Sequence, residues 1–178
     1  MQIGMLKKLC ILQIQEGGIS EGHFMQLSPQ SREFLIKKGE KYFIKPEFRK
    51  LIIIAMTGGV FDIIHPGHVL ALTEAKKHGD MLIVAIATDE TVKKIKQREP
   101  MHAQKERVEM VNALKPVDLA IPGGKDWRQT LAQVSPDIVI FGYDQQQKEI
   151  AGIKTIKLDA FAKHENSKTG KVREKLGF

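Results

Sequence analysis

The chain has 178 residues, 42% of them hydrophobic and 28% charged, with one cysteine and a formal net charge of +7. This length suits one ordinary domain, or one domain with a short appendage, whose apolar content builds a core without disulfides. A lone Cys10 excludes an intramolecular disulfide, and no apolar run reaches the roughly 20 residues of a membrane span. We therefore expect a globular, cytoplasmic protein. The positive charge suits anionic small molecules, nucleic acid or plain solubility, and selects none of them.

Residues 1–50 differ in pattern from the rest of the chain. Apolar residues recur there at helical spacing (Leu6, Leu9, Cys10 and Leu12) until Gly17 and Gly18 interrupt them. A second helix is expected over residues 31–38, stopped by Gly39, and a strand over residues 42–45. This order fits a shortened winged helix. A capping extension packed on the main domain is the alternative, which the shortness of the segment favours.

From residue 51 onward, strand and helix patterns alternate, and we expect one domain over residues 51–178. The expected strands are 51–56, 81–87, 118–121, 137–141 and 154–158, and the expected helices are 67–78, one starting near Asp89, 106–114 and 127–134. Near-continuous apolar strands suit a parallel sheet covered on both faces. The predicted fold is therefore α/β, a doubly wound parallel sheet with a short N-terminal extension.

One segment directly follows the first buried strand: residues 58–68 read GGVFDIIHPGH. In an open parallel sheet, ligands bind outside the carboxyl ends of the strands, where helix N-termini favour anions. Gly58 and Gly59 let the backbone approach a phosphate closely. His65 and His68, three residues apart at the start of a helix, can face one point. A metal-binding pair is the alternative, although no third ligand stands at a familiar spacing.

Residues 57–68 closely resemble the signature of the cytidylyltransferase-like nucleotidyltransferase superfamily, and the similarity extends over about residues 51–176. Within that superfamily, four segments look most like archaeal FAD synthetases: residues 89–94, 107–111, 113–118 and 136–145. The resemblance implies a Rossmann-like sheet of the HUP type, and transfer of AMP from ATP to FMN with release of pyrophosphate. Mg²⁺ or another divalent metal is the implied cofactor. The alternatives are CTP with glycerol-3-phosphate or a related polyol or sugar phosphate, and a nucleotide-sensing or DNA-binding regulator on the same fold.

The resemblance also implies roles for particular residues. His65 and His68 hold the triphosphate and donate hydrogen bonds to the charge that builds on the α-phosphoryl oxygens. The nucleotide lies against a loop and a strand end composed of Thr57, Gly58, Gly59, Val60, Phe61, Gly67, Gly142 and Asp144. Arg107 approaches the phosphates or the acceptor, and Lys96 reaches the phosphates, a role for which Lys93 and Lys94 compete. Asp62 caps the helix or organises Mg²⁺.

A second group of implied phosphate ligands opens the last helix: Ser167, Lys168 and Thr169 would hold the β- and γ-phosphates. Lys168 interrupts the hydroxyl pair that the superfamily shows here, and a capped surface helix is the alternative. We expect the basic segment 163–176 to act as a phosphate-binding lid. The expected partners are the nucleotide, its acceptor and a second copy of the chain. Nucleic acid is not expected, because the basic residues are spread out.

Overall fold

The computed structural model describes residues 2–159, and the chain divides into two compact units, residues 1–53 and 54–178. The sequence-based expectation set the boundary at residues 50 and 51. Each unit buries its own apolar side chains. No helix of the described residues is long and apolar enough to cross a membrane.

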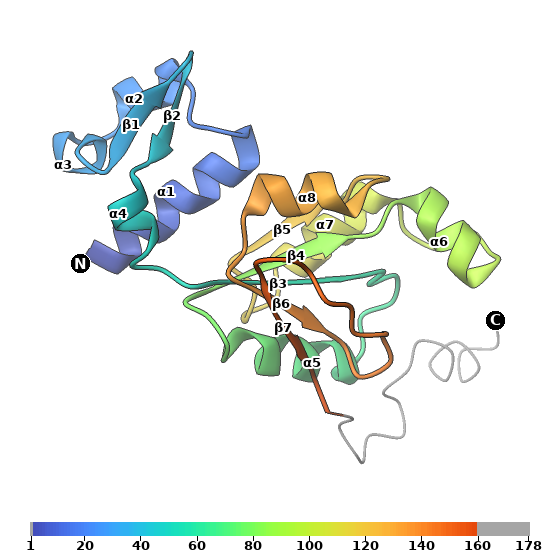
Figure 1. Ribbon diagram of the computed structural model, residues 1–178. Helices are drawn as coiled ribbons and strands as arrows, with labels where there is room; N and C mark the ends of the chain where they lie inside the picture. Colours follow the sequence, from blue (N-terminus) through green and yellow to red (C-terminus); the bar gives the residue numbers. More distant parts are fainter. Residues whose placement is uncertain (1, 160–178) are drawn as a thin grey trace. The chain divides into compact units, whose positions relative to one another are not determined.

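The first unit holds four helices and a β-hairpin (Figure 1). Helix α1 (Gln2–Glu16) buries a stripe composed of Leu6, Leu9, Cys10 and Ile14. Helices α2 (Glu21–Gln26) and α3 (Pro29–Arg32) begin after serines, whose hydroxyls accept hydrogen bonds from backbone N–H groups of the first turn. Strands β1 (Leu35–Lys38) and β2 (Lys41–Ile44) pair antiparallel, and α4 (Pro46–Arg49) ends the unit.

The helix expected over residues 31–38 is wrong, because its second half forms β1. Gly39, expected to stop that helix, has φ +62° and opens the two-residue turn between the strands. Leu35 pairs with Ile44, and both side chains are buried. Burial of this pair outweighs the helix propensity of the local sequence. The strand expected at residues 42–45 is present as β2.

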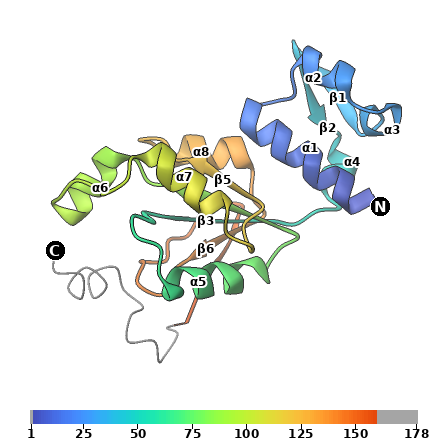
Figure 2. The same cartoon turned by 180° about the vertical axis from the view of Figure 1, so that it is seen from behind.

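The second unit is a five-stranded parallel sheet in the order β5-β4-β3-β6-β7, and its parallel strands agree with the prediction. Its strands are β3 (Ile54–Gly59), β4 (Met81–Ile86), β5 (Leu119–Pro122), β6 (Ile138–Phe141) and β7 (Lys154–Lys157). Its helices are α5 (Pro66–Lys76), α6 (Asp89–Lys96), α7 (Gln104–Asn112) and α8 (Trp127–Val134). Figures 1 and 2 show α5 and α8 on opposite sides of the sheet, which makes it doubly wound.

The core explains why the strands read as unbroken apolar runs. Side chains of α5 and α7 form one cluster with alternate residues of the strands, including Leu72, Val111, Leu82, Val84 and Ile140. The other alternate residues of the strands, Met56 and Ile83 among them, are also buried. Because both faces are covered, β3 and β4 carry almost no polar side chains.

The central strand, β3, begins later and ends later than the apolar pattern indicated. Leu51 and Ile53 are 54% and 46% exposed, since the residues after α4 form turns that precede the sheet. The strand then runs through Gly58 and Gly59, which pair with Ala85 and Ile86 of β4. The glycines therefore belong to the end of the strand, and the turn starts at Val60.

Candidate active site

His65 and His68 lie side by side just beyond the carboxyl end of β3. His65 is the N-cap residue of α5, and Pro66 occupies the first helical position, where its missing N–H costs nothing. Helical geometry brings the imidazole of His68 onto that of His65, with ring centroids 3.8 Å apart and 24° between the planes. The two histidines therefore meet, as their spacing indicated.

Burial favours the neutral state of both imidazoles. Burial and, to a smaller extent, the neighbouring His65 lower the pKa of His68 to about 3, although a hydrogen bond with the backbone of Ile63 opposes the shift. Burial also lowers the pKa of His65, although the carboxylate of Asp144 raises it. A neutral imidazole carries one N–H donor and one acceptor nitrogen. In the described part of the chain, Nδ1 of each ring is buried without a hydrogen-bond partner, as in a site that keeps polar atoms for a ligand.

The ring of Phe61 completes this cluster. Phe61 has φ +52°, an uncommon backbone conformation for a bulky residue, and strain of this kind often marks functional sites. Its ring lies 4.9 Å from that of His68 and packs against Gly59, where an added Cβ would come within 2.6 Å of the ring. Gly59 is thus required by Phe61, a reason different from close approach of a phosphate.

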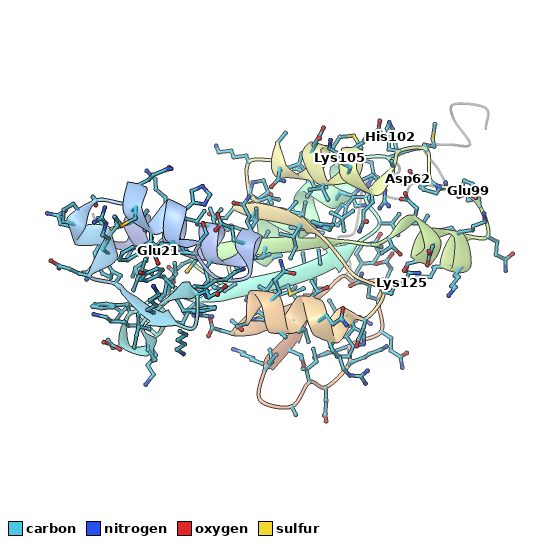
Figure 3. All side chains as sticks on the ribbon, turned by 90° about the horizontal axis from the view of Figure 1, so that it is seen from above. Glu21, Asp62, Glu99, His102, Lys105 and Lys125 are labelled. Carbon is cyan, nitrogen blue, oxygen red and sulfur yellow. The ribbon has the colours of Figure 1, made fainter. Side chains whose placement is uncertain are left out.

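Asp62 is a buried anchor for the segment that follows α6. Its two carboxylate oxygens accept hydrogen bonds from the Arg98 guanidinium at 2.8 Å and from the backbone N–H of Met101 at 2.7 Å. Burial raises the pKa of this carboxyl, but the hydrogen bonds from Arg98, Met101 and His102 outweigh it and lower the pKa. Asp62 does not cap α5, and its oxygens are already bound within the protein. Figure 3 shows Asp62 together with His102 and Glu99 at the same end of the sheet.

The guanidinium of Arg107 is fully buried and binds three backbone carbonyls and one carboxylate. It donates to Val60 O at 2.6 Å, Ala87 O at 2.8 Å, His102 O at 3.0 Å and Asp89 Oδ1 at 2.6 Å. Val60, Ala87 and His102 lie in the connections that follow β3, β4 and α6, and Asp89 is the first residue of α6. The geometry gives Arg107 a positioning role for the loop that carries the histidines, where the sequence pattern suggested direct contact with phosphate.

The connection after β6 lies next to the carboxyl end of β3, on the side of β3 that faces away from β4. Gly142 follows β6 directly, and its N–H donates to Gln145 Oε1 at 2.9 Å. The amide of Gln145 in turn donates to Gly58 O at 2.9 Å, which joins this connection to the end of β3. Asp144 is close enough to raise the pKa of His65. Gly142 and Asp144 therefore lie past the carboxyl end of β6, as the sequence indicated, and Asp144 acts on the charge of His65.

The remaining predicted residues separate into three groups. Thr57 and Gly67 are buried, and Gly58 and Val60 are half-buried, all in β3, the turn after it and the first turn of α5. Lys96 is exposed on the last turn of α6, with Lys93 paired to Glu99. Ser167, Lys168 and Thr169, with the segment 163–176, lie outside the described residues.

Sequence reasoning missed three polar side chains that hold the site together: Gln104, Gln145 and Arg98. Gln104 Nε2 donates to Ile86 O at 2.8 Å and to Gly123 O at 2.9 Å, joining the ends of β4 and β5. Glutamine has no distinctive spacing, so no motif points to these positions. Only Gln145 lies shortly after a strand end, four residues beyond β6, whereas Arg98 follows α6 and Gln104 begins α7.

Residues 2–159 form no metal site by themselves. No group of three or more His, Cys, Asp or Glu side chains in that range could hold an ion. Mg²⁺ typically binds through substrate phosphates and one or two carboxylates, and such binding needs no cage of this kind.

This fold and this histidine site define a nucleotidyltransferase, and the chain belongs to the cytidylyltransferase-like family, which its residues 56–167 match. Its relatives in that family include archaeal FAD synthases. The protein of Aciduliprofundum boonei is 49% identical over 102 residues, which are 56% of this chain and 68% of that one. The protein of Thermococcus onnurineus is 35% identical over 145 residues, or 74% of this chain and 95% of that one.

Two further similarities agree with this assignment. The FAD synthase of Methanopyrus kandleri is 50% identical over 102 residues, 53% of this chain and 67% of that one. Among solved structures, a lipopolysaccharide core biosynthesis protein from Thermoplasma volcanium is 35% identical, with a TM-score of 0.58 over 62% of this chain and 98% of that one. That similarity supports the doubly wound sheet.

Proposed function

We propose that this chain is an FAD synthase, which transfers AMP from ATP to the phosphate of FMN and releases pyrophosphate. The observation that carries the proposal is the stacked pair His65 and His68 beyond the carboxyl end of β3, where burial favours neutral imidazoles. The similarity to archaeal FAD synthases supports FMN and ATP over the other substrates that a cytidylyltransferase-like fold can take.

The reaction needs positioned donors more than a general base. A phosphate oxygen of FMN attacks the α-phosphorus of ATP, a new P–O bond forms, and the bond to the β-phosphate oxygen breaks with its electrons leaving on pyrophosphate. The FMN phosphate is largely ionised at pH 7, so no residue must remove a proton. Charge develops on the α-phosphoryl and leaving oxygens, where N–H donors of His65 and His68 stabilise it. The N-terminus of α5 adds a positive potential.

Other chain segments supply the remaining parts of this proposal. Arg107 positions the loop at Val60, while Asp62 and Arg98 position the segment at Met101. The exposed Lys96 can reach a phosphate from the end of α6. We assign Mg²⁺, or another divalent ion, to the triphosphate itself, where it neutralises phosphate charge. Ser167, Lys168 and Thr169 remain proposed phosphate ligands, and a homodimer remains the proposed assembly.

The direct test incubates the purified full chain with Mg²⁺, each of the four nucleoside triphosphates and one of three acceptors: FMN, riboflavin or glycerol-3-phosphate. Chromatography of the products and a pyrophosphate assay provide two independent measurements. We expect FAD and pyrophosphate from ATP with FMN only. Riboflavin is the matched control, since it lacks the attacking phosphate. Faster pyrophosphate release from CTP with glycerol-3-phosphate would overturn the proposal.

A further inference from the structure

Exposed apolar side chains of the second unit gather at one edge of its sheet. Among residues 54–159, the large apolar side chains that are exposed are Val69, Ile95, Met101 and Trp127. Each lies in a segment that follows the carboxyl end of β3, β4 or β5, the edge at which the histidine pair lies. Val69 and Trp127 lie in the first turns of α5 and α8, and exposed apolar side chains near a binding site can contact a ligand.

Trp127 differs from the other three, because it is the only exposed aromatic side chain among residues 2–159, at 46%. It is the first residue of α8, three and seven positions before the buried Thr130 and Val134. Residues at this spacing share one face of a helix. The indole thus lies at the start of the packed face of α8 but remains about half exposed. Packing of the helix therefore does not explain why a tryptophan occupies this position.

The connection that carries Trp127 is fixed relative to the rest of the edge. Gln104 binds the carbonyls of Ile86 and Gly123, and a Cβ at Gly123 would lie only 2.9 Å from Ile86 O. Lys125, which Figure 3 shows at the same end of the sheet as Asp62, forms an ion pair with Glu90 of α6 at 3.0 Å. A surface held in this way can bind a rigid ring without first being ordered.

The spacing between the strand ends that lead to the histidines and to Trp127 suits the dimensions of FMN. Strand β4 lies between β3 and β5, so the ends of β3 and β5 are two strand spacings apart, roughly 10 Å. In FMN, the ribityl chain separates the phosphate from the isoalloxazine ring by a similar length. A phosphate at His65 and His68 would therefore let the ring reach the connection that leads from β5 to α8.

We propose that Trp127 is the stacking platform for the isoalloxazine ring of FMN. This inference rests on the proposed function and names the residue that would select a flavin as acceptor. The electron-rich indole faces the electron-poor flavin ring. The guanidinium of Arg128 lies 5.4 Å from the indole centroid, and Lys125 is two residues away. Both side chains are largely exposed, and both can donate hydrogen bonds to the carbonyl oxygens of the flavin.

The first experiment uses Trp127 as the only tryptophan of the chain. FMN is titrated into the full chain without ATP while tryptophan emission is recorded, with free tryptophanamide correcting for absorption by FMN. We expect saturable quenching, and weaker quenching at equal concentrations by glycerol-3-phosphate. Emission that follows the tryptophanamide control throughout would overturn the proposal.

The second experiment compares three variants in the FAD assay. Trp127→Ala should raise the KM for FMN roughly tenfold or more, the usual loss for one aromatic stacking partner, while the KM for ATP stays unchanged. Trp127→Phe keeps a ring and should recover most of the loss. The matched control is Met25→Ala, which removes another exposed apolar side chain, 60% exposed, from the first unit.

The outcomes separate this inference from the proposed function. If the wild-type chain makes no FAD from ATP and FMN, the proposed function fails. If the wild type makes FAD and Trp127→Ala has the KM for FMN of the wild type, the function stands and the platform is wrong. Equal rises in the KM for FMN and for ATP would also contradict the platform. If Trp127→Ala does not fold, the KM of Trp127→Phe for FMN and the quenching titration of the wild type test the platform instead.

Discussion

The guanidinium of Arg107 donates a 2.6 Å hydrogen bond to the carbonyl of Val60, 47 residues earlier in the chain. Through this bond α7 holds the first residue of the turn that leads to Phe61 and the histidines. The remaining donors of Arg107 bind Ala87, His102 and Asp89. One buried side chain therefore fixes three connections at the edge where the chemistry takes place.

Replacing Arg107 should accordingly reduce both stability and turnover. Arg107→Met leaves three carbonyls and a carboxylate without their donor, and we expect the free energy of unfolding to fall by about 3 kcal/mol or more. Arg107→Lys should recover little, because an ammonium cannot reproduce the planar fork of donors. Urea unfolding measures the first effect and FAD formation the second. A stable Arg107→Lys variant with strongly reduced ATP affinity would instead indicate a phosphate ligand.

Removing either histidine should reduce turnover far more than binding. We expect His65→Ala and His68→Ala each to lose well over tenfold in kcat, with a modest rise in the KM for ATP, because their donors act on transition-state charge. His78→Ala, two residues beyond the C-terminal end of α5, is the matched control and should behave like the wild type. Turnover close to that of the wild type in either site variant would contradict the assignment.

The buried histidine pair should make the protein sensitive to acid. The pKa of His68 is about 3 in the folded chain against 6.5 for an ordinary histidine, so the unfolded state binds more protons between these values. Stability is therefore complete above pH 6.5 and falls as the pH decreases, by up to about 1.4 kcal/mol per pH unit for this group.

His68→Asn, which cannot be protonated in this range, should lose less stability than the wild type between pH 7 and pH 4.5. Urea unfolding at both pH values provides the comparison, and the shared carboxyl titrations cancel in the difference. If the free energy of unfolding depends on pH identically in the two proteins, protonation of His68 does not destabilise the fold. ATP should also raise the pKa of both histidines, which NMR titration of the ring protons can follow.

Residues 1–50 should be dispensable for the chemistry. The core cluster of the second unit draws only on residues 55–158, and the family match begins at residue 56. We expect a chain that starts at residue 51 to keep the parallel sheet by circular dichroism and to retain most of its FAD synthesis. Loss of activity with retained structure would assign the first unit a part in the reaction.

The sequence predicted the second unit well, because its strands are buried on both faces and its helices begin and end at clear signals. The limits of α8 were predicted to the residue. Prediction failed where tertiary pairing decided the structure, as at Leu35, which pairs with Ile44, and where apolar residues precede the sheet, as at Leu51 and Ile53.

For the candidate site, the sequence indicated which residues lie near the histidines but not all of the contacts between them. The spacing of His65 and His68 predicted their meeting, because the geometry is local to one helical turn. Most contacts of Arg107 and Asp62 join residues 18 to 47 positions apart along the chain. Such contacts follow from the packing of connections that no local pattern describes, so the sequence did not show that these two side chains hold connections together.

Two glutamines hold opposite flanks of the central strand independently. Gln145 joins the connection after β6 to Gly58, and Gln104 joins the connection after β5 to Ile86. The flank beside Asp144 and the flank beside Trp127 therefore both adjoin the strand that leads to the histidines. Each flank is held by the hydrogen bonds of its own glutamine. If the acceptor binds on the flank of Trp127 and the nucleobase on the flank of Asp144, as proposed, mutations on one flank can alter one preference and leave the other unchanged. We expect this separation to let the two specificities diverge one at a time as such enzymes evolve.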